Sequence, residues 1–387
     1  MTPRRIAVVA YTDIARDARV RRTADSLAAA GHEIVVIGFG ADPAARWRFE
    51  PLPDLGGLGA QRLALLATQA PANLAPWLAP WLHLVRRHHR AARAKLIALR
   101  PHVIHANDWI ALPACAQARR ATGARLVYDS HEVGVEEHAD NWRWRLVSQN
   151  SARATERRFI DEADAVVTVG EGVAEALAAL YPQAPRPVVV RNAPRFVAVA
   201  PAPAPDGRRR LLYHGVLKQG RGVEAAIEAV GRLPDCELTI RGGGAPAYVE
   251  GLRRLAAAGP AATRIAFEPP VAPDQVVAAA ASSHIGLFCA PLDTGQNRLA
   301  MPNKFFEYAM AGLAVVAAEG SELGALVRRL DCGVCAPAAT GEAIAGTLAA
   351  LDDARLAQLR ANALAAGRAF SWEQEEKTLL AVYERLV

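Results

Sequence analysis

Short apolar runs alternate with amphipathic segments along almost the whole chain. In the first half, runs rich in valine and isoleucine predict buried strands at 5–11, 33–39, 102–106, 125–129, 165–170 and 187–192. Equivalent runs in the second half predict strands at 210–215, 237–242, 264–269, 284–290, 313–318 and 333–337. Several intervening segments, such as 17–31, repeat their apolar residues with the period of an α-helix. This alternation predicts parallel sheets with helices on both faces.

One stretch interrupts the alternation. The sequence FVAVAPAPAPDGRRR at 196–210 is rich in proline and alanine and has no periodicity, which predicts a semi-rigid linker. A chain of 387 residues is also too long for one ordinary core. We therefore expect two doubly wound α/β domains that face each other across a cleft. The predicted bounds are 1–195 for the first domain, 196–208 for the linker, 209–368 for the second domain and 369–387 for a final helix that packs back on the first domain.

The composition narrows the class of protein. Apolar residues make up 52% of the chain and charged residues 22%, which is typical of a folded chain rather than a disordered one. The first residues run directly into a predicted strand, and no apolar run approaches the roughly 20 residues of a membrane span, so neither a secretory leader nor a span is expected. The five cysteines form no regular framework, and Cys332 and Cys335 lack the second pair of a zinc site. We expect a cytoplasmic protein.

The net charge of +6 is unevenly distributed. No acidic residue occurs from Leu55 to Asn107, and within this window two tryptophans precede a basic run, with the key positions at Trp77, Trp81, Arg86, Arg87 and Arg90. Tryptophan beside a basic helix is typical of an element that lies on an anionic bilayer surface. An equally supported interpretation is a pair of helices whose tryptophans are core and whose arginines are solvated. No nucleic-acid-binding motif accompanies the basic run, so no nucleic-acid partner is expected.

Residues 301–318, MPNKFFEYAMAGLAVVAA, predict a short helix followed by a buried strand. Asn303 is the expected cap of the helix, and Gly312 is the expected left-handed stop. The apolar side chains fall on one side of the helix, at Phe305, Phe306, Ala309 and Met310. Lys304 and Glu307 fall on the other side. They form either a surface ion pair or, if Glu307 faces a cleft, part of a binding site.

Polar residues follow the predicted strands of the first domain. Asp129, His131 and Glu132 lie at the end of one strand, where ligands bind in doubly wound sheets. A histidine there can donate to a substrate hydroxyl or phosphate, or exchange a proton with it. The alternative is a loop histidine that satisfies backbone groups. Other candidates on this acceptor side follow neighbouring strands, at Asp17, Arg19 and Asp108.

The second domain carries two glycine-rich turns after successive strands. Gly220 and Gly222 allow the backbone to approach a phosphate before a helix begins, and Arg221 and Lys218 supply positive charge. The next strand ends in a second turn that starts with Gly242 and Gly243. Two such turns in one domain indicate nucleotide binding. The first strand of the chain is not followed by Gly-x-Gly-x-x-Gly, which argues against a dinucleotide oxidoreductase.

Five stretches together resemble glycosyltransferase family 4, which has the GT-B fold: VYDSHE, DEADAVVTVG, VVVRNAP, RGVEAAIEAV and PNKFFEYAMAGLAVVAA. The resemblance covers nearly the whole chain in the expected order. It implies two facing Rossmann-like domains and a retaining hexosyl transfer that needs no metal. The donor would be a nucleotide diphosphate sugar, and the acceptor a glycan or lipid-linked glycan of a surface polysaccharide. No Asp-x-Asp occurs, in agreement with an absence of metal or other cofactor.

The resemblance also implies roles for individual residues. Glu307 resembles the second glutamate of the family's Glu-x7-Glu pair, which accepts bonds from the ribose hydroxyls. Arg221 resembles the cation that holds the diphosphate, and His131 the histidine near the transferred sugar; His131 and Glu307 are therefore the expected catalytic residues. The expected donor contacts are Gly215, Lys218, Arg221, Gly222, Gly242, Gly243, Gln296, Asn297, Asn303, Lys304 and Glu307.

The chain departs from the family pattern at three places. The first glutamate of the pair falls at Leu299, so Gln296 or Asn297 is expected to take over its contacts. The family's other basic phosphate-binding position, in its Gly-Arg-Leu pattern, is occupied by Val216. The sequence YTDIARD replaces the family's glycine-rich loop after the first strand. Two other functions therefore stay open, namely a sugar-nucleotide epimerase of the same architecture and a non-catalytic nucleotide-sugar-binding scaffold.

Overall fold

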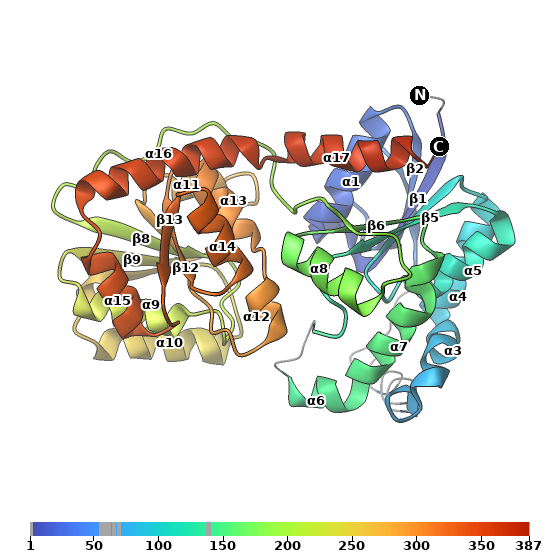
Figure 1. Ribbon diagram of the computed structural model, residues 1–387, viewed down its shortest axis with the longest axis horizontal. Helices are drawn as coiled ribbons and strands as arrows, with labels where there is room; N and C mark the ends of the chain where they lie inside the picture. The colour runs from blue at the N-terminus through green and yellow to red at the C-terminus, as the bar shows by residue number, and fades with distance from the viewer. Residues whose placement is uncertain (1–2, 54–62, 64–66, 68–70, 137–140, 387) are drawn as a thin grey trace. The chain divides into compact units, whose positions relative to one another are not determined.

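The computed structural model describes residues 3–53, 63, 67, 71–136 and 141–386. These residues form two compact units (Figure 1). Unit 1 consists of Met1–Arg191 together with Glu376–Val387, and unit 2 consists of Asn192–Glu375. Each unit contains one parallel sheet with helices on both faces, which confirms the predicted fold class.

Unit 1 is built on a seven-stranded sheet in the order β3-β2-β1-β4-β5-β6-β7. Its strands are β1 (Arg5–Asp13), β2 (Glu33–Phe39), β3 (Arg48–Pro51), β4 (Val103–Asn107), β5 (Arg125–Ser130), β6 (Ala165–Thr168) and β7 (Val188–Val189). All six strands predicted for this half are confirmed. The additional strand, β3, is an edge strand of four residues with no apolar run, so periodicity gives no signal for it.

The helices of unit 1 cover both faces of this sheet (Figure 1). They are α1 (Ala18–Ala29), α3 (Ala79–Leu84), α4 (Arg87–Leu99), α5 (Leu112–Thr122), α6 (Trp142–Trp144), α7 (Asn150–Phe159) and α8 (Glu171–Leu180). The last helix, α17 (Trp372–Glu384), begins in unit 2 and belongs to unit 1 from Glu376 onward. Asp17 caps α1 by accepting a hydrogen bond from the Val20 amide at 3.1 Å. The Tyr383 hydroxyl lies 2.6 Å from His105 Nδ1, which anchors α17 to β4.

Unit 2 is built on a six-stranded sheet in the order β10-β9-β8-β11-β12-β13. Its strands are β8 (Arg209–His214), β9 (Cys236–Arg241), β10 (Ile265–Glu268), β11 (Ile285–Phe288), β12 (Ala314–Ala318) and β13 (Gly333–Ala336). Its helices are α9 (Val223–Arg232), α10 (Pro246–Ala258), α11 (Val276–Ala280), α12 (Gly295–Leu299), α13 (Asn303–Met310), α14 (Glu322–Arg329), α15 (Gly341–Ala349) and α16 (Asp353–Ala369). All six strands predicted for this half are confirmed. In Figure 1, α9, α10 and α15 cover one face of the sheet, and α11, α13 and α16 cover the other.

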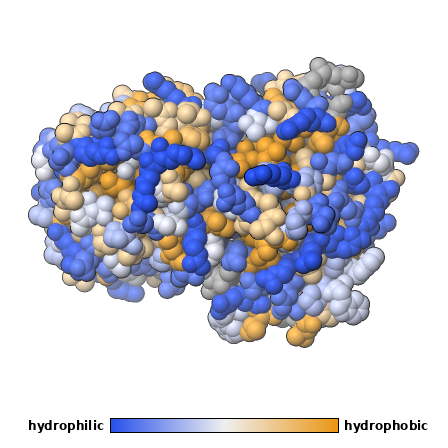
Figure 2. Space-filling view, viewed as in Figure 1, coloured by the Kyte–Doolittle hydropathy of each residue, from blue (hydrophilic) through white to orange (hydrophobic). Residues whose placement is uncertain are grey.

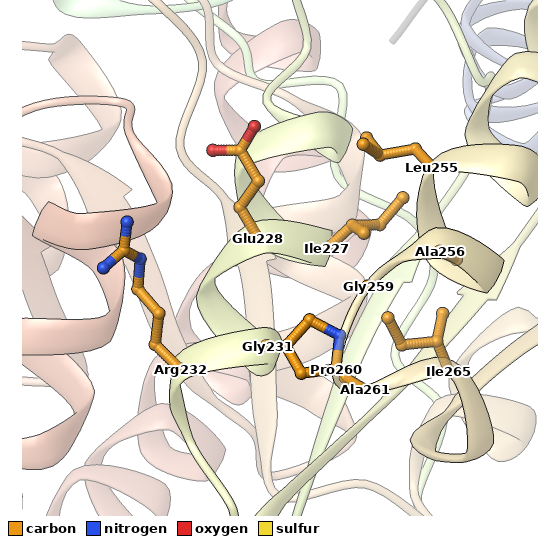
Figure 3. A pocket seen from close by; sticks show the side chains of 10 residues that line it. All are labelled: Ile227, Glu228, Gly231, Arg232, Leu255, Ala256, Gly259, Pro260, Ala261 and Ile265. Carbon is orange, nitrogen blue, oxygen red and sulfur yellow. The ribbon is translucent and has the colours of Figure 1, made fainter.

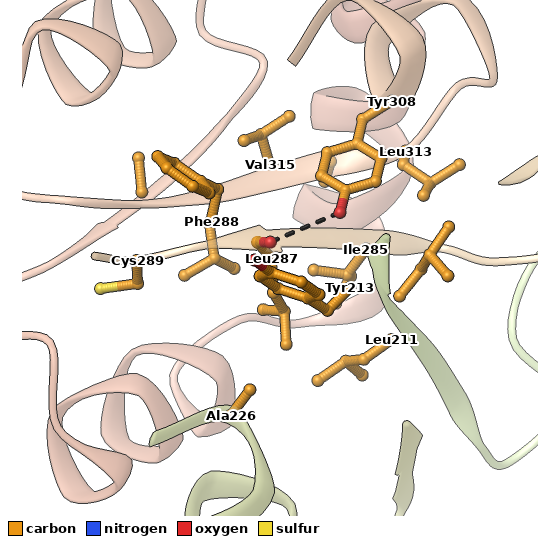
Figure 4. Close-up of a cluster of buried hydrophobic side chains, with 14 of the residues drawn as sticks. Leu211, Tyr213, Ala226, Ile285, Leu287, Phe288, Cys289, Tyr308, Leu313 and Val315 are labelled. Atoms are coloured by element: carbon orange, nitrogen blue, oxygen red, sulfur yellow. Dashed lines mark hydrogen bonds between the residues drawn. The ribbon is translucent and has the colours of Figure 1, made fainter. Parts of the chain in front are cut away.

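Helix α13 packs directly on β11 in the core of unit 2 (Figure 4). A Cβ atom at Gly286 would lie 2.3 Å from the Tyr308 ring, so only glycine lets the ring approach the strand this closely. The Tyr308 hydroxyl donates to the carbonyl oxygen of Leu287 at 3.4 Å. Because this buried ring fixes α13, the polar residues on the opposite side of the helix have defined positions.

The two ends of α13 test the sequence predictions. The expected cap at Asn303 is wrong, because the helix begins at Asn303 itself, Pro302 is in the cap position, and no side chain caps the helix. Proline is suited to this position, since it has no amide hydrogen to satisfy. The expected stop at Gly312 is confirmed by its φ of +74°. The four apolar residues predicted for one side of the helix are all buried.

The residues expected to form a linker, 196–208, contain no helix or strand and lie within unit 2. The guanidinium of Arg360, on α16, donates to the carbonyl oxygens of Ala202 and Pro203 and to that of Gly312. These bonds tie the proline-rich stretch to the end of α13.

Candidate functional site

Two glycine turns lie against each other at the carboxyl ends of β8 and β9. Gly215 follows β8 with a φ of +112°, and Gly242 follows β9 with a φ of +152°. The Gly215 amide donates to the carbonyl oxygen of Arg241 at 2.9 Å. A Cβ atom at Gly242 would lie 1.9 Å from the Gly215 oxygen. Both turns therefore require glycine for their conformation, and Gly242 also requires it for space.

The N-terminus of α9 lies beside these turns. Gly222 is its cap residue with a φ of +78°, and a Cβ atom there would lie 2.1 Å from the carbonyl oxygen of Cys289, the residue after β11. No side chain caps the helix. Its first amides point away from the helix body and suit an anion such as a phosphate.

Asn297 connects this loop to α12. Its side-chain amide donates to the carbonyl oxygens of Gly220, at 3.2 Å, and Pro291, at 2.8 Å. Its oxygen accepts from Arg221 Nη1 at 3.4 Å. Asn297 is buried, so it positions the guanidinium of Arg221 at the start of α9.

Lys304 extends from α13 to the same place. Its Nζ lies 4.0 Å from the ring centroid of Tyr213 and 4.8 Å from that of Phe288. It also lies 3.4 Å from the position that a Cβ atom would take at Gly215, directly above the first glycine turn. Burial and the charge of Arg221 together lower the pKa of Lys304 to about 7, and Glu307 opposes both effects.

Glu307 lies one turn further along α13. Its Oε2 is 2.8 Å from His214 Nε2, in an ion-pair contact that is not aligned as a hydrogen bond. The His214 ring stacks on Tyr308 with centroids 4.5 Å apart, and its amide donates to the Tyr308 hydroxyl at 3.1 Å. Among the ion pairs of the described residues none joins Lys304 to Glu307, so the interpretation of this pair as a surface salt bridge is wrong.

The remaining donor candidates lie around this group with differing exposure. Lys218, Gly243 and Asn303 are exposed, and Gln296 is half-buried on α12. Val216 is 71% exposed beside Gly215. His214 is the residue that sequence reasoning missed. Its signal was present, because it is the last residue of a strand and immediately precedes a glycine turn.

Unit 1 carries a separate polar group at the ends of β4 and β5. Arg19 and Asp129 form a buried ion pair through two hydrogen bonds of 2.8 and 2.7 Å, and Arg19 Nη1 also donates to the carbonyl oxygen of Val190 at 2.8 Å. His105 Nε2 lies 3.3 Å from Asp129. Burial alone would raise the pKa of Asp129, but Arg19 and His131 hold it well below its usual range.

His131 lies at the edge of this network and is half-buried. Its Nδ1 lies 3.3 Å from Asp108 Oδ2, and its Nε2 lies 3.7 Å from Asp129 Oδ2. Burial opposes its charge, but the two carboxylates outweigh burial and raise the pKa of His131 to about 9. At neutral pH the ring is therefore an imidazolium that donates hydrogen bonds and does not accept a proton.

The other acceptor-side candidates differ in their surroundings. Arg19 is 2% exposed and its donors are bound within unit 1, and Asp17 caps α1 and accepts from the Thr12 hydroxyl at 2.8 Å. Both therefore have structural roles in this unit. Glu132 is half-buried next to His131, and its carbonyl oxygen accepts from the Ser130 hydroxyl at 2.6 Å.

The basic segment of unit 1 exposes its tryptophans. Trp77 is 73% and Trp81 61% exposed, so the interpretation of both as core residues is wrong. Arg87 and Arg90 are also exposed, whereas Arg86 is half-buried and burial lowers its pKa to about 10. In Figure 2, orange apolar residues reach the surface beside blue polar ones in the region where Figure 1 places α3 and α6.

A cavity of about 280 Å³ lies at the far end of α9 from Arg221. Its apolar lining includes Ile227, Leu255 and Ile265, while Glu228 and Arg232 extend toward the other side of α9 (Figure 3). None of the residues discussed above lines this cavity. Within the described part of the chain, no group of three or more histidine, cysteine or carboxylate side chains could hold a metal ion. No helix in the same part is long and apolar enough to cross a membrane.

The chain matches two family models that correspond to its two halves. Residues 17–193 match a glycosyl transferase 4-like domain, and residues 208–353 match glycosyl transferases group 1. No curated protein matched the sequence significantly.

Solved structures share the fold at low sequence identity. A sucrose-phosphate synthase from Thermosynechococcus elongatus is 17% identical with a TM-score of 0.75, and the match covers 99% of both chains. HepE from Anabaena, solved with UDP and glucose, is also 17% identical, with a TM-score of 0.70 and 99% of both chains covered. WaaG, a glycosyltransferase of lipopolysaccharide biosynthesis, is 16% identical with a TM-score of 0.69, over 97% of this chain and 98% of that chain. With both halves matched and the two-sheet architecture shared, the chain belongs to the GT-B glycosyltransferases and is similar to family 4.

Proposed function

We propose that this glycosyltransferase moves a hexosyl group, with retention of configuration, from a nucleotide diphosphate sugar to a glycan or lipid-linked glycan acceptor of a surface polysaccharide. The observation that supports this most strongly is the convergence of Arg221, Lys304 and Glu307 on the glycine turns of unit 2. Two cations and uncapped helix amides suit a diphosphate, and a carboxylate suits the hydroxyls of a ribose.

The chemistry follows from these contacts. Departure of the nucleotide diphosphate develops negative charge, which Arg221, Lys304 and the amides of α9 would stabilise without a metal ion. Retention in a single step requires the acceptor hydroxyl to attack the face from which the diphosphate leaves, and the departing phosphate oxygen would take up the proton of that hydroxyl. His131, as an imidazolium, would donate to the transferred sugar or to the acceptor, and it would not act as the general base.

A panel of nucleotide sugars tests the proposed reaction. UDP-glucose comes first, because HepE was solved with UDP and glucose. We expect one donor to be hydrolysed slowly alone and faster with a glycan acceptor. Epimerised donor in the absence of acceptor would instead identify an epimerase. Donor binding without turnover under any condition would identify a non-catalytic scaffold. The presence of Leu299 in place of a family glutamate is the reason to consider this alternative.

We further propose that the enzyme works at an anionic membrane surface on the cytoplasmic side. Two exposed segments support this proposal. The first presents Trp77, Trp81 and the arginines of α4. The second presents Trp142 and Leu146, which are 58% and 65% exposed.

Asn73 joins the two segments. Its side-chain amide donates to the carbonyl oxygen of Leu146 at 2.6 Å, and its oxygen accepts from the Asn150 amide at 2.8 Å. These bonds hold the two segments next to each other in unit 1, and exposed tryptophans on neighbouring segments suit insertion among lipid headgroups. An acceptor linked to a lipid would be presented at such a surface.

A further inference from the structure

Burial and the charge of Arg221 disfavour the ammonium form of Lys304, while two ring faces and Glu307 favour it. Its Nζ lies among the rings of Tyr213 and Phe288 and above the backbone of Gly215. The positive charge of the Arg221 guanidinium lowers the pKa of Lys304. Glu307, whose negative charge raises it, contacts His214. Arg221 thus adds positive charge near Lys304, and no ion pair among the described residues joins Lys304 to a carboxylate.

The charged and titratable groups around Lys304 come from β8, α9, α13 and the loop that precedes α9. Arg221 precedes α9, Glu307 lies on α13, and His214 and Tyr213 end β8. Glu224, on α9, is bound by the Tyr248 hydroxyl at 2.7 Å. Burial, and to a smaller extent the charge of Arg221, lower the pKa of Lys304 to about 7, and Glu307 only partly offsets them.

We infer that Lys304 binds the diphosphate of the donor as a cation, and that donor binding therefore draws a proton onto Lys304 at neutral and mildly alkaline pH. The inference rests on the proposed function, since it names a residue and a pH dependence for the same donor site. An anion placed between Arg221 and Lys304 supplies the counter-charge that the free site lacks. The charged form of Lys304 is then favoured, and its pKa rises in the complex.

The sign of the pH dependence follows directly. Well below pH 7 Lys304 is already protonated, so binding takes up little or no proton on this group. Above pH 7 the free site is increasingly neutral at Lys304, and binding must first protonate it. Donor affinity therefore falls as pH rises from 7 toward 9, by up to about tenfold per pH unit while the complex stays protonated.

Calorimetry of the full chain tests the inference with the nucleoside diphosphate that binds most tightly among UDP, GDP and ADP. Titration at pH 8 in two buffers of different ionisation enthalpy gives the number of protons taken up. For the wild type we expect an uptake approaching one proton per ligand. Lys304→Met should bind more weakly and lose this uptake, and Lys304→Arg, which stays charged, should bind at pH 8 without uptake.

The controls distinguish the contribution of Lys304 to proton uptake from that of the rest of the site. Lys304→Met retains Arg221, Glu307 and His214, so the difference from the wild type isolates Lys304. Lys95→Met removes a lysine of unit 1 that pairs with Glu50 at 2.6 Å, and it should leave both affinity and uptake unchanged. The nucleoside without phosphates should take up no proton.

The outcomes are distinguishable. Nucleoside diphosphate binding without proton uptake at pH 8, or uptake that persists in Lys304→Met, overturns the inference and leaves the proposed function standing. Absence of binding by all three nucleoside diphosphates overturns both. Thermal unfolding of the variants confirms that a loss of uptake does not reflect a loss of folding.

Discussion

At the residue scale, the donor site depends on how the carboxylate of Glu307 is held in position. Glu307 is on the same side of α13 as Lys304, yet its carboxylate contacts His214, which stacks on the buried ring of Tyr308. The side chain of Glu307 is 21% exposed, so the carboxylate remains accessible from one side while its position is fixed. A hydroxyl group that binds there meets an acceptor already held in place.

Replacement of Glu307 by alanine is expected to weaken donor binding strongly. The ribose would lose a charged acceptor, which contributes on the order of 1.5–3 kcal/mol, or about 10- to 150-fold in Kd. Calorimetry with the nucleoside diphosphate measures the change. The matched control is Glu319→Ala, which removes an exposed glutamate paired with Arg328 elsewhere in unit 2. Equal affinity of Glu307→Ala and the wild type for the nucleoside diphosphate would show that Glu307 does not bind the donor.

The two glycines before α9 separate the cost of a left-handed backbone conformation from the cost of a steric clash. Gly220 and Gly222 have φ values of +77° and +78°, but a Cβ atom meets nothing within 4 Å at Gly220 and lies 2.1 Å from the Cys289 oxygen at Gly222. Gly220→Ala should cost only the backbone strain of about 1 kcal/mol. Gly222→Ala should cost a further 1–3 kcal/mol and displace the start of α9. Urea denaturation of both variants measures the difference, and equal losses would contradict the close approach.

At the scale of elements, the sequence predicts strands well because each buried strand of a parallel sheet is a continuous apolar run. Twelve strands were predicted in this way, and β3 was missed because an edge strand such as RFEP needs no such run. Glycines and cations of one loop reveal the site of unit 2, since they are neighbours in sequence. The Arg19–Asp129 pair joins residues 110 positions apart, and no local pattern encodes it.

The segment of α3 and α4 contains a cluster of aromatic and imidazole rings that the sequence did not reveal. Tyr11 of β1 contacts His88 and His89, and His83 contacts His89 and Trp109, with ring centroids 4.5–5.6 Å apart. Burial lowers the pKa of His83 to about 3 and that of His88 to about 4. These rings are therefore neutral in the folded chain at neutral pH.

Acid is expected to loosen this element before the rest of unit 1. An unfolded histidine binds a proton below about pH 6.5, whereas the folded rings stay neutral down to pH 3–4, so stability is complete above pH 6.5 and falls as pH falls toward 4. Hydrogen exchange of α3 and α4 should accelerate over this range. His88→Gln should reduce the effect, and His102→Gln, at an exposed position before β4, should not. Exchange that is independent of pH after correction for the intrinsic rate would contradict the prediction.

At the scale of the whole molecule, the charge distribution favours one surface for contact with anions. The net charge is only +6, yet 53 consecutive positions from Leu55 to Asn107 contain no carboxylate. The described residues of this window include both exposed tryptophans and the exposed arginines of α4. Arg86 does not belong to that exposed set, because it is half-buried and its pKa is lowered.

Binding to anionic vesicles is therefore expected, and it should weaken with salt. Each cation near an anionic leaflet contributes on the order of 1 kcal/mol, and the tryptophans add a hydrophobic contribution. Salt screens the electrostatic part over about 10 Å at 0.1 M. Replacement of Arg87, Arg90 and Arg93 by glutamine should release the protein from vesicles in flotation assays and leave donor hydrolysis intact. The control variant carries three exposed substitutions of the same charge on unit 2, at Arg254, Arg329 and Arg368. Both variants have the same net charge, so equal release of the two would show that net charge alone causes the binding. If the wild type does not bind anionic vesicles at low salt, the proposed membrane association is wrong.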